Sequence, residues 1–133
     1  MPEAKVTMQV RRVNDTISVI DIQGELTAFA EQTLMNAYTA ACGPHTNAIL
    51  LNFSQMEYMN SSGIGLIVTL LIRVNRQKQR LVAFGLSEHY QHIFQLTRLN
   101  DAINICAGEA DAILAASVPP VNPNSRPSFF KRR

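Results

Sequence analysis

The 133-residue chain contains no tryptophan, two cysteines and no long run of apolar residues. Cys42 and Cys106 are too few for a disulfide framework or a zinc site, which needs four ligands in short paired spacings. We expect both to be small apolar core residues in a reducing cytoplasm. The longest nearly uncharged apolar stretch, residues 63–72, spans ten residues, whereas a membrane-spanning helix needs about 20. The N-terminus also lacks the basic start and apolar run of a secretory signal. We therefore expect a cytoplasmic protein without a membrane span.

Acidic residues are absent from residues 118–133, which hold four of the twelve lysines and arginines and four of the six prolines. Residues 1–118 consequently carry a net charge of −2. Binding to the phosphates of a nucleic acid needs lysines and arginines clustered on the folded surface. Because residues 1–118 are mildly acidic, we do not expect them to bind nucleic acid directly. We predict one domain, residues 1–117, and a disordered, basic, proline-rich tail, residues 118–133. The tail ends in Phe-Phe-Lys-Arg-Arg and could touch an anionic membrane or an acidic partner, although most basic tails do neither.

Hydrophobic periodicity predicts alternating strands and helices. Alternating apolar residues on both sides of Asn14-Asp15 predict a first hairpin, and residues 28–41 show helical spacing before Gly43-Pro44. Short apolar runs at 48–53, 81–86 and 103–106 predict further strands. Helices are expected after Asn60, after Ser87 and over 109–116. Because each helix returns the chain for a parallel neighbour, the order indicates an α/β domain with a mixed sheet.

Polar residues interrupt this apolar pattern at Asn60-Ser61-Ser62-Gly63. One interpretation is purely structural, since an Asn or Ser oxygen at this point caps the free amides of the following helix. The other is a phosphoacceptor hydroxyl, because a serine at a helix N-terminus faces solvent from a rigid element. A phosphate there would gain from the helix dipole and would change the charge of a surface that a partner must cover.

The residues of known active sites do not accompany this motif. No Gly-Lys-Ser/Thr follows, as a P-loop requires, and Ser61 and Ser62 lack the glycine two residues earlier that a nucleophile elbow needs. His45, His89 and His92 have no ligand partners at a suitable spacing. The sequence therefore predicts a protein that is not an enzyme and that holds no metal or cofactor.

The helix after the motif has more apolar residues than one buried face requires. A stripe at helical spacing is expected to face the sheet: Ile64, Ile67, Val68, Leu71 and Val74. Leu66 and Leu70 lie well round the helix from this stripe. Either neighbouring elements bury both, or they form an exposed apolar docking patch beside Ser61, which would also leave room for a dimer.

Two segments resemble a known family. The first runs from the apolar residues 49–53 through Asn60-Ser61-Ser62-Gly63-Ile64-Gly65-Leu66, and the second is Gly24-Glu25-Leu26. Both resemble the STAS domain family, in particular the bacterial anti-sigma factor antagonists, and the likeness covers about residues 6–116. It implies a single α/β STAS-like domain, a mixed sheet of four or five strands and helices packed largely on one face.

The resemblance also implies partner switching without catalysis by the domain itself. An anti-sigma factor that is also a serine kinase would phosphorylate Ser61, and a metal-dependent, PP2C-like phosphatase would reverse this. The partner-binding residues carried over, together with the neighbouring apolar pair, are Glu25, Leu26, Thr27, Asn60, Ser61, Ser62, Gly63, Leu66 and Leu70. Asn60 and Thr27 each replace an aspartate that is common in the family, so both departures remove an acid from this face.

The sequence thus yields two functional hypotheses. In the first, the unmodified protein binds an anti-sigma factor and frees a sigma factor for transcription, and phosphorylation of Ser61 breaks the contact. In the second, the domain is a constitutive scaffold or adaptor in a signalling assembly or beside a lipid transporter. Asn60, Thr27 and the basic tail favour the second slightly.

Overall fold

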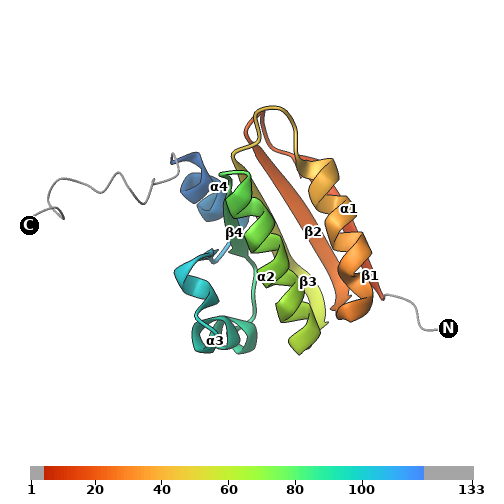
Figure 1. Cartoon of the computed structure of the whole chain (residues 1–133). Helices are drawn as coiled ribbons and strands as arrows, with labels where there is room; N and C mark the ends of the chain where they lie inside the picture. Colours follow the sequence, from red (N-terminus) through yellow and green to blue (C-terminus); the bar gives the residue numbers. More distant parts are fainter. Residues whose placement is uncertain (1–4, 119–133) are drawn as a thin grey trace, which may run out of the picture.

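The computed structural model describes residues 5–118 and folds them into a five-stranded sheet with α-helices on both of its faces (Figure 1). The predicted tail, residues 118–133, lies outside these residues except for Val118. The elements in chain order are β1 (Val6–Arg12), β2 (Ile17–Leu26), the 3-10 helix η1 (Ala28–Ala30), α1 (Glu31–Ala41), β3 (Ala48–Met59), α2 (Ser61–Arg76), β4 (Arg80–Phe84), α3 (Glu88–Leu96), the 3-10 helix η2 (Leu99–Asp101), β5 (Asn104–Cys106) and α4 (Glu109–Ser117).

The sheet is mixed, as the sequence predicts. Its strand order is β1-β2-β3-β4-β5. β1 pairs antiparallel with β2, and each later pair is parallel. The hairpin turn is fixed by Asn14, whose side-chain oxygen accepts from the amides of Thr16 and Ile17. The parallel pairs need crossover connections, which α1, α2 and α3 supply.

Successive side chains of each strand point to opposite faces of the sheet, so the apolar side chains form two cores. The larger core lies between the sheet and the α1–α3 layer, and it includes Ile20, Leu51 and Phe94. The smaller core lies under α4 on the opposite face, where Leu50 and Val82 meet Ala112. Three helices therefore cover one face and one helix covers part of the other, which confirms the expected packing largely on one face.

β3 is longer than the sequence pattern indicates, because its second half mixes polar and apolar residues without the continuous apolar run of its first half. It continues beyond residue 53 to Met59, and its last residues pair with Glu25 and Leu26 of β2 after two register shifts. The first predicted helix, residues 28–41, is divided into η1 and α1. No helix within residues 5–118 has the length and apolar character needed to cross a membrane.

The expected buried stripe of α2 is only partly correct. Ile67 and Val74 are buried, and Ile64 and Leu71 are half-buried against the larger core. Of the two alternatives for Leu66 and Leu70, burial is correct and the exposed docking patch is wrong: they are 8% and 0% exposed, whereas Val68 is 38% exposed. The buried stripe is Gly63, Leu66, Ile67, Leu70 and Val74. This stripe has nearly the same helical spacing as the one expected, so a helix that is apolar on more than one side satisfies the pattern in either orientation. The argument for a dimer from these two leucines therefore fails.

Candidate functional site

The N-terminus of α2 is formed by the Asn60-Ser61-Ser62-Gly63 motif. Asn60 is the N-cap, and its side-chain oxygen accepts from the Gly63 amide at 3.0 Å. Asn60 has extended backbone geometry, and its carbonyl accepts from the Ile64 amide at 3.0 Å. The capping interpretation is thus correct for Asn60, and it leaves both serine hydroxyls free for another use.

Gly63 allows this helix end to lie against the end of β2. A Cβ atom at position 63 would overlap the carbonyl oxygen of Leu26 and come within 2.8 Å of the Met59 side chain. The Asn60 amide also donates to the Leu26 carbonyl at 3.4 Å. The structure therefore brings together the two segments that carry the family resemblance, residues 24–27 and 60–63.

Ser61 and Ser62 occupy the first two positions of α2, and both are exposed. Neither hydroxyl makes a hydrogen bond with another of residues 5–118. The first turn of α2 contains no acidic residue, so a phosphate on Ser61 would be the first negative group within this positive helix turn. The position is accessible to a modifying enzyme, and modification requires no rearrangement of the cap.

The three residues at or just after the end of β2 that the sequence analysis assigned to partner binding, Glu25, Leu26 and Thr27, differ in their exposure and contacts. The side chain of Leu26 is fully buried in the larger core and cannot contact a partner. The Thr27 hydroxyl accepts from the Phe29 amide at 3.4 Å and caps η1. Glu25 is half-buried at the same end. Of these three, Glu25 and Thr27 have side chains at the surface.

An apolar surface that the sequence prediction missed extends from Ser61 along α2. Ser61, Gly65, Val68 and Ile72 follow one another at helical spacing, and all are exposed, Ile72 to 49%. We call these four residues the α2 stripe. A Cβ at Gly65 would meet nothing within 4 Å. Phe29 and Tyr58 are also exposed, to 57% and 47%, near the start of the helix. The sequence of the helix contains apolar residues at helical spacing on a second side, and this pattern could have revealed the surface.

A hydrogen bond from α3 holds the strand that leads into the motif. The Tyr90 hydroxyl accepts from the Met59 amide at 2.9 Å. Ser87 caps α3 by accepting from the Tyr90 amide, as the sequence indicates. The position of the residue before Asn60 therefore depends on a side chain 31 positions later in the sequence.

A separate polar groove of about 310 Å³ lies on the sheet face that α4 leaves partly uncovered. Arg11 pairs there with Asp21 at 2.6 Å and with Glu109 of α4 at 2.7 Å. Hydrogen bonds from Arg11 lower the pKa of both carboxyl groups. Asn52 donates a further hydrogen bond to Asp21 at 2.8 Å. These groups satisfy one another and join β1, β2, β3 and α4.

The cysteines and histidines do not gather into a site. Cys42 and Cys106 are half-buried free thiols packed against the two cores, and burial raises the pKa of Cys106. His89 and His92 are exposed on α3. In the part of the chain that the structure describes, no three His, Cys, Asp or Glu side chains are grouped so as to hold a metal ion.

The family is decided by a match that covers most of the chain. The model of the STAS domain matches residues 8–112. The chain belongs to the STAS domain family. Among curated relatives, the anti-sigma-B factor antagonist of Staphylococcus aureus is 28% identical over 94 residues, which cover 71% of this chain and 87% of that protein. The anti-sigma-B factor antagonist of Staphylococcus epidermidis is 26% identical over 95 residues, covering 71% and 88%.

Solved structures share the fold of this STAS domain. The phosphorylated form of the Bacillus cell fate determinant SpoIIAA superposes with a TM-score of 0.64 at 25% identity, covering 82% of this chain and 98% of that one. An anti-sigma factor antagonist from Mycobacterium paratuberculosis gives a TM-score of 0.71 at 19% identity, covering 86% and 98%. The expected STAS fold is therefore confirmed.

Proposed function

We propose that this STAS domain is an anti-sigma factor antagonist that binds an anti-sigma factor through the N-terminal end of α2 and the α2 stripe. The exposed Ser61 hydroxyl at the first position of a capped helix carries this proposal. The names of its relatives, anti-sigma-B factor antagonists, support it. So does its likeness to a structure described as a phosphorylated form.

The chemistry of the surface suggests how a partner would bind. Gly65 lets another backbone approach the helix closely, and Val68 and Ile72 offer apolar area to bury. Glu25 and Glu57 lie at the strand ends beside the start of α2. We therefore expect a partner with an apolar contact centre, with basic groups facing Glu25 and Glu57. An acidic partner group would face Ser61, because the positive N-terminal end of α2 has no acid in its first turn.

Phosphorylation of Ser61 would switch this contact off. A phosphate adds about −1.5 to −2 charges at pH 7, and here it would stand at one end of an apolar contact where it loses water. Each unit of added charge would repel one acidic partner group about 5 Å away by about 3 kcal/mol at an effective dielectric of about 20, or about two decades in affinity. The kinase in this scheme is the anti-sigma factor itself, and a PP2C-like phosphatase restores the binding form.

The test is a calorimetric titration of an anti-sigma factor that contains a serine-kinase domain with matched variants of the full chain. We expect Ser61→Ala to bind within about twofold of the unmodified protein, as a neutral surface substitution does. Ser61→Asp should bind about two decades more weakly, because it places a charge in the contact. Ser62→Asp adds the same charge beside the stripe and should cost less.

The same titration examines the α2 stripe. Val68→Ser/Ile72→Ser removes exposed apolar area and should weaken binding without unfolding the domain. Leu96→Ser is the matched control, because Leu96 is 71% exposed on α3. Equal affinities of Ser61→Ala and Ser61→Asp would refute the switch and favour the adaptor hypothesis, which the replacement of two family aspartates by Asn60 and Thr27 also suggests.

A further inference from the structure

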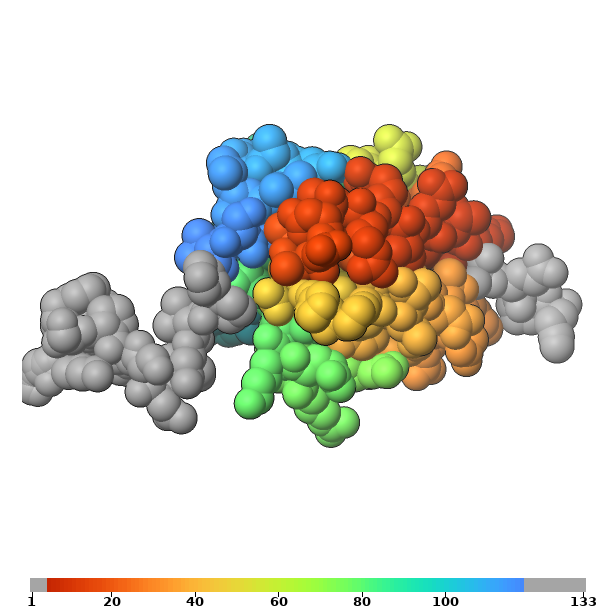
Figure 2. Space-filling model, turned by 90° about the horizontal axis from the view of Figure 1, so that it is seen from above, coloured from red at the N-terminus to blue at the C-terminus, as the bar shows by residue number. Residues whose placement is uncertain are grey.

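Cations gather at the end of the domain opposite Ser61. The register of the sheet places the end of β1 and the starts of β2, β3 and β4 in one row, through the pairs Arg12–Ser18, Ile17–Ala48 and Ala48–Arg80. Figure 2 looks onto this end, where the β1–β2 turn, the loop before β3, the end of α2 and α4 meet. α2 runs from Ser61 toward it, so the two ends of the domain are separated by the length of a 16-residue helix.

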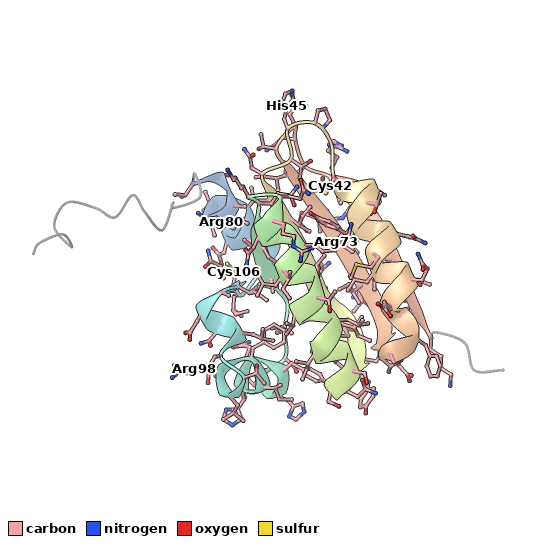
Figure 3. The ribbon with its side chains drawn as sticks, in the orientation of Figure 1. Cys42, His45, Arg73, Arg80, Arg98 and Cys106 are labelled. Carbon is pink, nitrogen blue, oxygen red and sulfur yellow. The ribbon has the colours of Figure 1, made fainter. Side chains whose placement is uncertain are left out.

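This basic end consists of Arg12, Arg76, Lys78 and Arg80, with Asp15 as the acid in the neighbouring turn. Among the described residues, no ion pair involves Arg12, Arg76 or Lys78. Arg73, one turn earlier, lies over the Tyr38 ring at 5.2 Å. Figure 3 shows Arg73 and Arg80 in the same half of the molecule as His45. A helix dipole accounts for cations at the end of α2, but not for Arg12 at the end of a strand.

Exposed apolar side chains adjoin these cations. Leu114 lies on the outer face of α4, and Val118 follows the helix directly as its C-cap residue; they are 69% and 55% exposed. Arg80 donates to the carbonyl of Ala115 at 3.4 Å, which places the last turn of α4 beside the start of β4. The sequence that follows Val118 adds four more cations and two phenylalanines without any acid.

We propose that this basic end, with the outer face of α4, binds the surface of an anionic lipid bilayer. Anionic headgroups attract juxtaposed lysines and arginines, and aliphatic side chains beside them enter the headgroup–acyl boundary. A nucleic acid would use the cations alone and would leave Leu114 and Val118 in water. The combination of charge and apolar exposure thus favours a bilayer over a polyphosphate.

In this orientation the Ser61 end faces away from the lipid. Partner binding through the α2 stripe and lipid binding through the basic end can therefore occur together. The lipid proposal does not depend on the proposed function, and it can be tested on the protein without any partner.

The experiment is co-sedimentation of the full chain with vesicles of phosphatidylcholine, with and without phosphatidylglycerol. We expect binding to the anionic vesicles and loss of binding near 1 M salt, where charges are screened beyond about 3 Å. Each cation near such a surface contributes roughly fivefold to the partition coefficient, so Arg76→Gln/Lys78→Gln should lower it about 25-fold. Leu114→Ser/Val118→Ser should lower it several-fold at unchanged charge.

The matched control is Lys5→Gln/Arg98→Gln, which removes two charges elsewhere. Lys5 lies beside Glu25 at the other end of the sheet, where its carbonyl accepts from the Glu25 amide, and Arg98 lies beside α3 (Figure 3). This variant should retain most of the binding. Absence of binding to anionic vesicles, an equal loss in the control, or full competition by duplex DNA would each overturn the proposal.

Discussion

Gly63 and Gly65 stand two positions apart in α2, and the structure predicts opposite effects of placing alanine at each. A Cβ at position 63 would overlap the Leu26 carbonyl, which belongs to the backbone of β2 and cannot turn aside. A Cβ at position 65 would meet open space. The two substitutions add the same methyl group to one helix, so each serves as the other's control.

The magnitudes follow from helix propensity and from packing. Alanine is favoured over glycine inside a helix by about 1 kcal/mol, so Gly65→Ala should raise the free energy of unfolding by roughly 0.5–1 kcal/mol. At Gly63 the gain is smaller, because this residue lies in the first turn. Overpacking costs about 1–3 kcal/mol, so Gly63→Ala should lower the free energy of unfolding by about 1–2 kcal/mol.

Urea unfolding followed by circular dichroism measures both changes in the free energy of unfolding. The slope of this free energy against urea concentration should be the same for both variants. The overlap at Gly63 also moves the start of α2 away from β2, so the Ser61 end should bind its partner more weakly in Gly63→Ala. In Gly65→Ala the added methyl lies within the α2 stripe and affects binding without loss of stability. If Gly63→Ala proved as stable as Gly65→Ala, the close contact between α2 and Leu26 would be wrong.

Two further predictions concern contacts that hold the elements together. Arg11→Met removes the partner that lowers the pKa of Asp21, and these half-exposed pairs contribute about 1 kcal/mol. Because the folded-state pKa of Asp21 lies below its unfolded value, this stability is present above about pH 4 and is lost as the pH falls. The stability difference from the unmodified protein should therefore shrink between pH 7 and pH 3, and a difference independent of pH would contradict the ion pair. Tyr90→Phe leaves the Met59 amide without its acceptor and should cost about 1 kcal/mol. Hydrogen exchange at the Met59 amide should become faster, and unchanged protection would show that Tyr90 does not hold β3.

Local sequence signals predicted most of the elements. The turn at Asn14-Asp15, the cap at Ser87 and the short apolar runs at β3 and β4 act within a few residues, and each appears in the structure. The full length of β3 was not predictable in this way. Its final pairs with Glu25 and Leu26 join residues about thirty positions apart, after two register shifts.

In the candidate site, too, some features follow from local sequence signals and others only from contacts between distant residues. The sequence determined that an Asn-Ser-Ser-Gly motif starts a helix, because capping is a local property of the side chain. Only the tertiary structure decided that Gly63 is required by the Leu26 carbonyl and that Tyr90 holds Met59. Both are contacts between elements that meet through the sheet.

The outward face of α2 was also decided by tertiary structure. Its sequence is apolar on more than one side, so both stripes fit helical spacing and no local rule chooses between them. Neighbouring elements contribute the core that buries Leu66 and Leu70 and leaves Val68 and Ile72 exposed. The sequence by itself determined the α/β class, the capped helix and the exposed serine motif. The packing of distant elements determined which residues surround that serine, because burial is a property of the assembled layers.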